Sequence, residues 1–393
     1  YHCTELGRKT ANDAMDVHGG KGVMMGPSNY LARGFMATPI AITVEGANIL
    51  TRSLIIYGQG AIRCHPFVLR EWNAATDEDE DRGLIEFDDA LFGHIGYAIS
   101  NMARSFFLAL THAKFSRVPL NTPTRRYYQN INRYSAAFAL ASDFAMLTLG
   151  GSLKKRELLS ARLGDMLSSM YLASTVLKHF ENQGRRASDL PLVEWSVRTL
   201  MYQAQEALHA FLRNFPNRLV ATVLRVSIFP RGRTYSAPSD EIAARVVEIV
   251  TTPGESRERL SELAYTRNEP GNPLGLLQEA LELTKKHLPL ENRLRQARKE
   301  GLIASDNLGQ QIEEAEKGQV ISKAEARGLR EYNDKVLALL AVDDFTSDQL
   351  ARVTPEKAKA KKVSRKKSPS KKSTKVKTVA SKKVASKKKT ETS

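Results

Sequence analysis

A single carboxylate, Glu45, lies in the stretch TVEGANILTRS, residues 43–53, between two segments that carry little charge. Such an acid could act as a general base, because a pocket poor in water raises the pKa of a carboxyl group toward neutral pH. The positive end of a following helix would lower that pKa. The same acid could instead serve only as a favourable group at the helix N-terminus. The residues alone leave both interpretations open.

A second candidate is the glycine-rich stretch HGGKGVMMGPSNYLARG, residues 18–34. Its five glycines and one proline predict a loop with special backbone geometry. No strand pattern precedes this stretch, so it is not the turn of a dinucleotide-binding Rossmann unit. These glycines could also do no more than turn the chain. The GQG at 58–60 lies inside a helical pattern and is not a phosphate loop.

Helices are expected on both sides of these residues. Apolar spacing predicts one helix over 1–18 and another from about 46 to 63, where Cys64-His65-Pro66 ends it. The stretch EWNAATDEDEDRG, residues 71–83, is acidic and has little to bury, which is typical of a linker. We therefore divide the chain into four segments: 1–68, an acidic linker at 69–87, a helical region at 88–345 and a tail at 346–393.

The region from about 88 to 345 is predicted to be a series of helices. Its clearest stripe of apolar residues, at steps of three and four, is Leu159, Leu163, Met166, Met170, Ala173, Leu177 and Phe180. Further helices are expected at 89–117, 126–149, 188–214, 239–251, 274–287 and 319–341. The run ATVLRVSIF could be a strand in isolation, but among helices it more readily ends one of them. The predicted fold class is all-α.

The charge of the chain is concentrated in its tail. Of the net charge of +16, +15 falls between Arg352 and Ser393, which hold 17 Lys or Arg and two acids. The Lys-, Ser- and Ala-rich tail cannot bury enough apolar surface to fold, so we expect disorder there. Two cysteines are too few for a disulfide framework or a zinc site and fit a reducing compartment. No apolar run approaches the ~18 residues of a membrane span, and we expect a cytoplasmic protein.

Several motifs occur in one order: a helix, HGGKG, a proline and an arginine at Pro27 and Arg33, VEG, and then Arg52 seven residues after the acid. This order resembles the C-terminal helical domain of the acyl-CoA dehydrogenase family. There the pattern is Q-x-x-G-G-x-G, then P and R, then Y-E-G-T before a helix with arginine at the same interval. LTRSLIIYGQGAIRCHPF and the long helical extension are similar to the long bacterial type that acts in fatty-acid β-oxidation.

The resemblance implies an FAD-dependent enzyme that forms a trans-2-enoyl-CoA from an acyl-CoA. Glu45 would remove the α-proton, and its main-chain N–H would bond the thioester oxygen, while the β-hydride passes to the flavin. Gly46 would let the substrate approach, and Gly19, Gly20 and Gly22 would lie against the FAD of a neighbouring subunit. Implied partners are the acyl-CoA, an electron acceptor such as an electron-transfer flavoprotein, and further copies in a homo-oligomer. Full-length protein could also touch the inner membrane peripherally.

The sequence also departs from the family pattern. Asp16 stands at the usual glutamine, and Val44 and Ala47 flank Glu45-Gly46 where tyrosine and threonine are usual. The chain opens on Tyr1 rather than methionine, and the family's N-terminal helical and middle β domains, which hold most contacts to FAD and acyl-CoA, are not in it. We therefore expect an enzyme fragment that is inactive in isolation. Arg52 is expected to form a structural ion pair or to pack its stem, rather than to touch the substrate.

Another class of function is a non-enzymatic helical binding module with a basic tail for nucleic acid or an anionic membrane. The tail has no aromatic residue for base stacking, so such binding would be weak and blind to sequence. A simply solubilising tail is a further alternative, as is an interaction role for 88–345. The eight histidines show no ligand spacing, and we predict no metal site.

Overall fold

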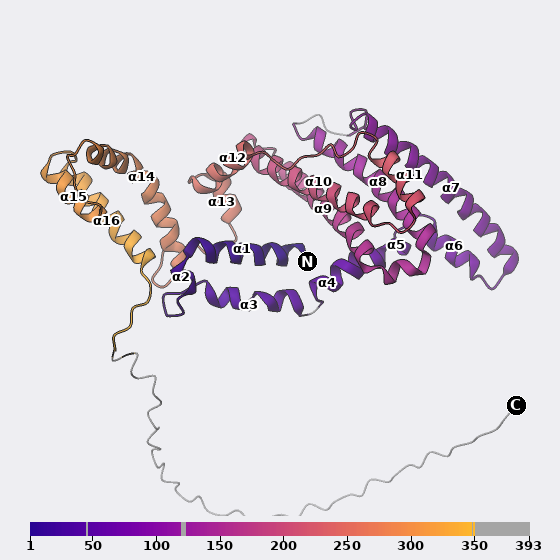
Figure 1. Cartoon of the computed structure of the whole chain (residues 1–393), viewed down its shortest axis with the longest axis horizontal. Helices are drawn as coiled ribbons and strands as arrows, with labels where there is room; N and C mark the ends of the chain where they lie inside the picture. Colours follow the sequence, from indigo (N-terminus) through magenta and orange to yellow (C-terminus); the bar gives the residue numbers. More distant parts are fainter. Residues whose placement is uncertain (45, 119–122, 348, 350–393) are drawn as a thin grey trace, which may run out of the picture. The chain divides into compact units, whose positions relative to one another are not determined.

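The computed structural model describes residues 1–44, 46–118, 123–347 and 349. Every regular element within these ranges is a helix, and no strand occurs among them (Figure 1). The predicted all-α fold class is therefore confirmed. Residues Tyr1–Asp343 make up one compact unit and Asp344–Ser393 a second. The disorder that we predicted for 346–393 falls almost wholly outside the described residues.

The first helices form an antiparallel pair joined by a short turn. They are α1 (His2–His18), α2 (Gly20–Val23) and α3 (Ala32–Thr43), and α1 packs on α3. The helix predicted at 1–18 is confirmed. The prediction of a loop throughout 18–34 was wrong, because one helical turn, α2, forms inside this stretch. The apolar segment before Glu45 is helical although it contains Pro39, which lacks the N–H for one helical hydrogen bond.

The predicted helix at 46–63 is present, but its centre is wider than an α-helix. Its parts are α4 (Asn48–Leu50), the π-helix η1 (Thr51–Gln59) and α5 (Gly60–Arg63). A π-helix is rare and often lies at a functional site. Gly164 brings the neighbouring helix close, because a Cβ there would lie 3.1 Å from the carbonyl oxygen of Arg52. The contact therefore depends on the absence of a side chain at Gly164.

The acidic stretch at 69–87, which we predicted to be a linker, is largely helical. It contains α6 (Val68–Ala75) and the first turns of α7 (Glu80–Leu110). Asp79 caps α7 by accepting a hydrogen bond from the backbone N–H of Arg82, at 3.1 Å. Acids are favourable at a helix N-terminus because they face its positive end. The acids thus lie at the start of a helix. The domain boundaries that divide 1–68, 69–87 and 88–345 stay predictions.

The main hydrophobic core lies between three long helices and a shorter one. They are α8 (Arg125–Leu149), α9 (Glu157–Asn182), α10 (Leu190–Arg213) and α11 (Arg218–Ile228). All seven residues of the predicted stripe on α9 are buried in this core, which confirms the spacing argument. The run ATVLRVSIF ends α11, as expected. Among the described single helices, only Arg125–Lys155 is long and apolar enough to cross a membrane, but 44% of that apolar window is buried inside the protein.

The remaining helices are shorter or lie outside this core. They are η2 (Gly150–Lys155), η3 (Ala187–Asp189), α12 (Asp240–Thr251), α13 (Glu255–Ser261), α14 (Pro273–Lys299), α15 (Leu308–Lys317) and α16 (Lys323–Leu340). The last three share a second core that includes Leu294, Ile312 and Leu329. Ser322 and Glu325 form a capping box that fixes the start of α16.

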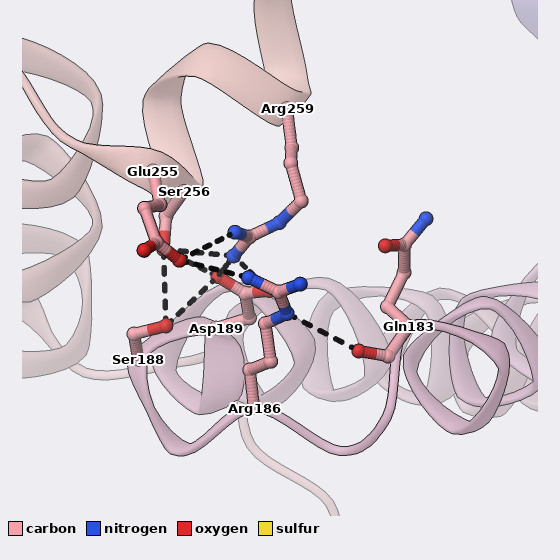
Figure 2. Close-up of polar contacts among 7 residues, drawn as sticks. All are labelled: Gln183, Arg186, Ser188, Asp189, Glu255, Ser256 and Arg259. Atoms are coloured by element: carbon pink, nitrogen blue, oxygen red, sulfur yellow. Dashed lines mark hydrogen bonds and ion pairs between the residues drawn. The ribbon is translucent and has the colours of Figure 1, made fainter.

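A polar cluster joins α13 to the start of α10 (Figure 2). Arg259 Nη2 donates to both carboxylate oxygens of Asp189, at 2.8 and 2.7 Å. The Ser256 hydroxyl donates to the same carboxylate at 2.5 Å, and Arg186 pairs with Glu255 at 2.8 Å. Burial raises the pKa of Asp189, but the hydrogen bonds from Ser256 and Arg259 and the charge of Arg259 outweigh it, and the pKa ends below its usual value.

Candidate functional site

The segment that carries the predicted catalytic base connects α3 to α4. Glu45 itself lies outside the described residues. Before it, Val44 is extended, and after it Gly46 has φ of +108°, a conformation that side chains rarely adopt. A Cβ at Gly46 would meet nothing within 4 Å. Glycine is therefore needed here for its backbone conformation, and the space beside it is open to a ligand.

Asn48 holds this segment against α1. Its side chain is buried, and Nδ2 donates to Thr4 Oγ1 at 2.9 Å and to Glu5 Oε1 at 2.9 Å. Burial of an amide is favourable only when its polar atoms are paired, as they are here. The contact places the residues just after Glu45 beside the N-terminal end of α1.

Arg52 makes a second contact that holds this segment, one helical turn further along the chain. Its Nε and Nη2 donate to the two oxygens of Asp165 on α9, at 2.7 and 2.6 Å. This fork-on-fork geometry is the strongest kind of arginine–carboxylate pair. Tyr1 also donates its hydroxyl to Asp165 Oδ1 at 2.9 Å, and burial together with the Asp165 charge raises the pKa of Tyr1. The ion pair predicted for Arg52 is confirmed.

The glycine turn between α1 and α2 is open on one side. Gly19 has φ of +53°, and a Cβ at Gly19 or Gly20 would meet nothing within 4 Å. Gly22 is buried, and a Cβ there would lie 3.2 Å from the carbonyl oxygen of Met15. The backbone of Gly19 and Gly20 can thus be approached from outside, whereas Gly22 is required for packing.

Asn29 fixes the shape of this turn from within. Its Nδ2 donates to the carbonyl oxygens of Lys21, Gly22 and Met24, and its Oδ1 accepts from Leu31 N and Ala32 N. One side chain thus satisfies five backbone groups that the glycine-rich sequence leaves without helical partners. The turn is preorganised, and no local sequence pattern singled out this asparagine.

The glycine turn and the Gly46 segment lie at opposite ends of the α1–α3 pair. Asn48 contacts the start of α1, while Gly19 follows its end, and 17 helical residues span about 25 Å. Within one chain, Gly19 and Gly20 therefore lie far from Gly46. This separation is compatible with the expectation that the glycine turn serves a neighbouring subunit.

A partly buried cluster of two imidazoles and two carboxylates lies further along the chain. His65 Nε2 is 2.8 Å from Asp143 Oδ1, His94 Nδ1 is 2.7 Å from Glu71 Oε1, and His94 Nε2 is 4.0 Å from Asp143 Oδ1. The ring centroids of His65 and His94 are 4.6 Å apart. One potential ligand atom from each of His65, His94 and Asp143 lies within 4.8 Å of the others, which is close enough to surround a metal ion.

The hydrogen bonds of His65 decide how this cluster can react. Its Nδ1 accepts from the backbone N–H groups of Phe67 and Val68, at 3.2 and 3.1 Å, so it carries no hydrogen. The ring is therefore neutral, and its hydrogen is on Nε2, which donates to Asp143. A metal would need the lone pair of that nitrogen. These contacts oppose the binding of a metal ion. That the chain has no metal site therefore stays our prediction.

Sequence reasoning missed Asn48, Asp165 and the pairing of His65 with Asp143. Asp165 lies 113 positions after Arg52, and Asp143 lies 78 positions after His65, so no local spacing connects them. One feature of the sequence indicates that these two acids have buried partners. Asp143 and Asp165 interrupt the apolar pattern of helices whose other residues are typical of a hydrophobic core.

The described residues thus make up an all-α domain with an open glycine turn and a glycine-dependent connection to a π-helix. The family described as acyl-CoA dehydrogenase, C-terminal, bacterial type, matches residues 62–345. Because that match covers more than two thirds of the chain, the chain belongs to this family. No solved structure was found to match it. The match begins after Glu45 and Gly46 and ends at 345, where we expected the helical extension to end.

Proposed function

We propose that this chain is the C-terminal part of an FAD-dependent acyl-CoA dehydrogenase of fatty-acid β-oxidation, which forms trans-2-enoyl-CoA. The observation that carries the proposal is the family match over 62–345, directly after the ordered motifs HGGKG and VEG. In this proposal the acyl-CoA is the substrate, an electron-transfer flavoprotein takes the electrons, and the full-length enzyme is a cytoplasmic homo-oligomer.

In the proposed reaction, Glu45 accepts the proton from the α-carbon of the thioester. Gly46 leaves room for the acyl group, and the open space around its backbone supports this role. Arg52 acts at a distance: its pair with Asp165, together with Asn48, fixes the direction in which the chain leaves Gly46. General-base catalysis typically contributes about 10²–10⁴-fold to a rate, so precise placement of this segment matters.

The residues of the glycine turn fit a flavin nucleotide. Gly19 and Gly20 expose backbone without side chains, as a pyrophosphate contact requires, and Asn29 holds the turn in that shape. FAD would supply the acceptor for the β-hydride. We propose that parts of the enzyme outside this chain complete both the flavin site and the acyl-CoA site, and that the isolated chain is inactive.

The proposal is tested on the full-length protein. We expect a yellow protein whose visible flavin absorbance is bleached by a long-chain acyl-CoA under anaerobic conditions, with trans-2-enoyl-CoA as the product. Butyryl- and palmitoyl-CoA compared side by side would also give the chain-length preference. A purified full-length protein that binds no flavin, or that leaves every acyl-CoA unchanged, would refute the assignment.

A further inference from the structure

The segment that follows α16 contacts the glycine turn near the start of the chain. Lys21 Nζ donates to the carbonyl oxygen of Ala341 at 2.6 Å. The backbone N–H of Ser28 donates to both carboxylate oxygens of Asp343, at 3.0 and 3.1 Å. These hydrogen bonds join residues that are 320 and 315 positions apart in the sequence. We call residues 341–343 the C-terminal latch.

The side chain of Asp343 fits closely against Gly26. A Cβ at Gly26 would lie 2.7 Å from the Cβ of Asp343, well inside the ~3.5–4.0 Å at which two carbon atoms pack. The φ of Gly26 lies outside the left-handed region, so its backbone conformation does not require glycine. The approach of Asp343 does require it. The neighbouring acid, Asp344, is exposed, whereas Asp343 is partly buried.

The two contacts of the latch lie at both ends of the glycine turn. Lys21 directly follows Gly20, and Ser28 directly precedes Asn29, the residue that fixes the turn from within. A carboxylate that accepts from a backbone N–H forms a charge-assisted hydrogen bond, which is stronger than a neutral one. The latch therefore restrains the turn from outside, while Asn29 restrains it from inside.

The latch begins at a fixed point of the fold. Helices α14, α15 and α16 pack on one another around the second core, and α16 ends at Leu340. The backbone of Ala341 is extended, with φ of −56° and ψ of 130°. A short segment that leaves a packed helix loses less conformational entropy on ordering than a free chain end does. Its few hydrogen bonds are therefore enough to hold it on the turn.

We propose that the C-terminal latch holds the glycine turn in the shape that receives the flavin nucleotide, with Asp343 as a positioning residue. Asp343 acts through Ser28 and is given no contact with the flavin. The identity of the ligand rests on the proposed function, whereas the contact between the latch and the turn does not. The proposal also gives helices α14–α16 a role, which is to carry the latch.

The latch leaves the open side of the turn free. A Cβ at Gly19 or Gly20 would meet nothing within 4 Å, so the backbone proposed to contact the pyrophosphate stays accessible while the latch is in place. The carboxylate of Asp343 lies instead against Gly26 and Ser28. This arrangement favours a latch that supports flavin binding over one that blocks it.

The first test is the affinity of the full-length protein for FAD, measured by titrating the flavin-free protein and following flavin fluorescence. We expect Asp343→Ala to raise the dissociation constant at least about 10-fold, which is the scale of one charge-assisted hydrogen bond. Asp344→Ala is the matched control and should stay within about 2-fold of wild type. Asp343→Asn should lie between them, because its amide oxygen can still accept from Ser28 N. Circular dichroism checks that all variants keep their helix content.

The outcomes of this titration separate the latch from the proposed function. Equal affinity of Asp343→Ala and Asp344→Ala would overturn the role of the latch while leaving the flavin enzyme in place. Tighter binding by Asp343→Ala would overturn it as well, since the latch would then oppose the flavin. A wild-type protein that binds no FAD would refute the proposed function, and with it the ligand of the turn.

The second test needs no flavin and uses hydrogen exchange of the 393-residue chain. A Cβ at Gly26 and the side chain of Asp343 compete for one space, so Gly26→Ala should displace the latch. We expect Gly26→Ala and Asp343→Ala each to speed exchange in the peptide that contains Ser28 at least about 10-fold. Gly34→Ala is the control, because a Cβ there meets nothing within 4 Å.

The double variant Gly26→Ala, Asp343→Ala decides whether the two residues act through one contact. We expect it to exchange no faster than Asp343→Ala alone, because the latch can be lost only once. If the two effects multiply, Gly26 and Asp343 act independently and the proposed contact is wrong. Exchange at the wild-type rate in Asp343→Ala would contradict the latch directly.

Discussion

Asp143 is the best place to test whether the buried histidine cluster is organised as described. Its side chain is 5% exposed, that of His65 is 7% exposed, and the two are joined by a 2.8 Å hydrogen bond. Asp143→Ala leaves the Nε2 hydrogen of His65 without its acceptor in a largely buried site. A buried donor left without a partner costs about 1–3 kcal/mol, and more where the lost partner was charged. Because the lost acceptor is a carboxylate, we expect a loss of about 2–4 kcal/mol.

Asp143→Asn is the informative comparison. Its amide oxygen can still accept from His65 Nε2, and its NH₂ group takes the place of the oxygen that has no partner. Since the neutral, Nε2-protonated form of His65 needs an acceptor rather than a negative charge, Asn should cost only about 1 kcal/mol or less. The alanine and asparagine variants should therefore differ by about 1–3 kcal/mol in the free energy of unfolding.

Urea unfolding followed by circular dichroism measures that difference, and ¹⁵N NMR of the His65 ring reports its tautomer directly. An asparagine variant as unstable as the alanine variant would refute the reasoning, because the charge of Asp143 would then be what the cluster needs. A His65 ring protonated on Nδ1 would refute it as well, since that nitrogen could not accept from the backbone of α6.

Three further predictions concern other parts of the chain. Asp165→Asn should lower the free energy of unfolding by about 1–2 kcal/mol in urea, because it weakens a half-exposed pair with Arg52; equal stability would contradict the role given to that pair. The lowered pKa of Asp189 means that its contribution to stability is present above pH ~4 and lost as pH falls through that pKa, so Asp189→Asn should flatten the acid limb of the stability profile; an unchanged profile would argue against it. Deleting 353–393 should leave dehydrogenase activity of the full-length protein intact and weaken salt-sensitive binding to DNA or anionic vesicles; loss of activity would show that the tail is more than an accessory.

Periodic spacing made much of the fold predictable. The α9 stripe and the ends of α8, α10 and α12 follow from apolar steps of three and four, because these residues must share one face of a helix. The errors came from local composition. The glycine-rich stretch at 18–34 suggests a loop throughout, yet it contains the helical turn α2, and the run of acids that suggests a linker starts α7.

The candidate site was less predictable for a physical reason. The family resemblance singles out Gly46, and the structure adds that its φ of +108° is a conformation that favours glycine. The partners that hold the site, Asp165 for Arg52 and Asp143 for His65, depend on how distant helices pack. That packing is a property of the whole fold, and a polar residue in an apolar helix signals only that some partner exists.

The most direct test of the proposed function is the rate of flavin reduction in full-length Glu45→Gln. Glutamine has nearly the size of glutamate but cannot take the α-proton. We predict that the variant binds flavin normally, while the rate of bleaching by a long-chain acyl-CoA in stopped flow falls by at least about 100-fold. A variant that reduces its flavin at close to the wild-type rate would contradict the assignment of Glu45 as the catalytic base.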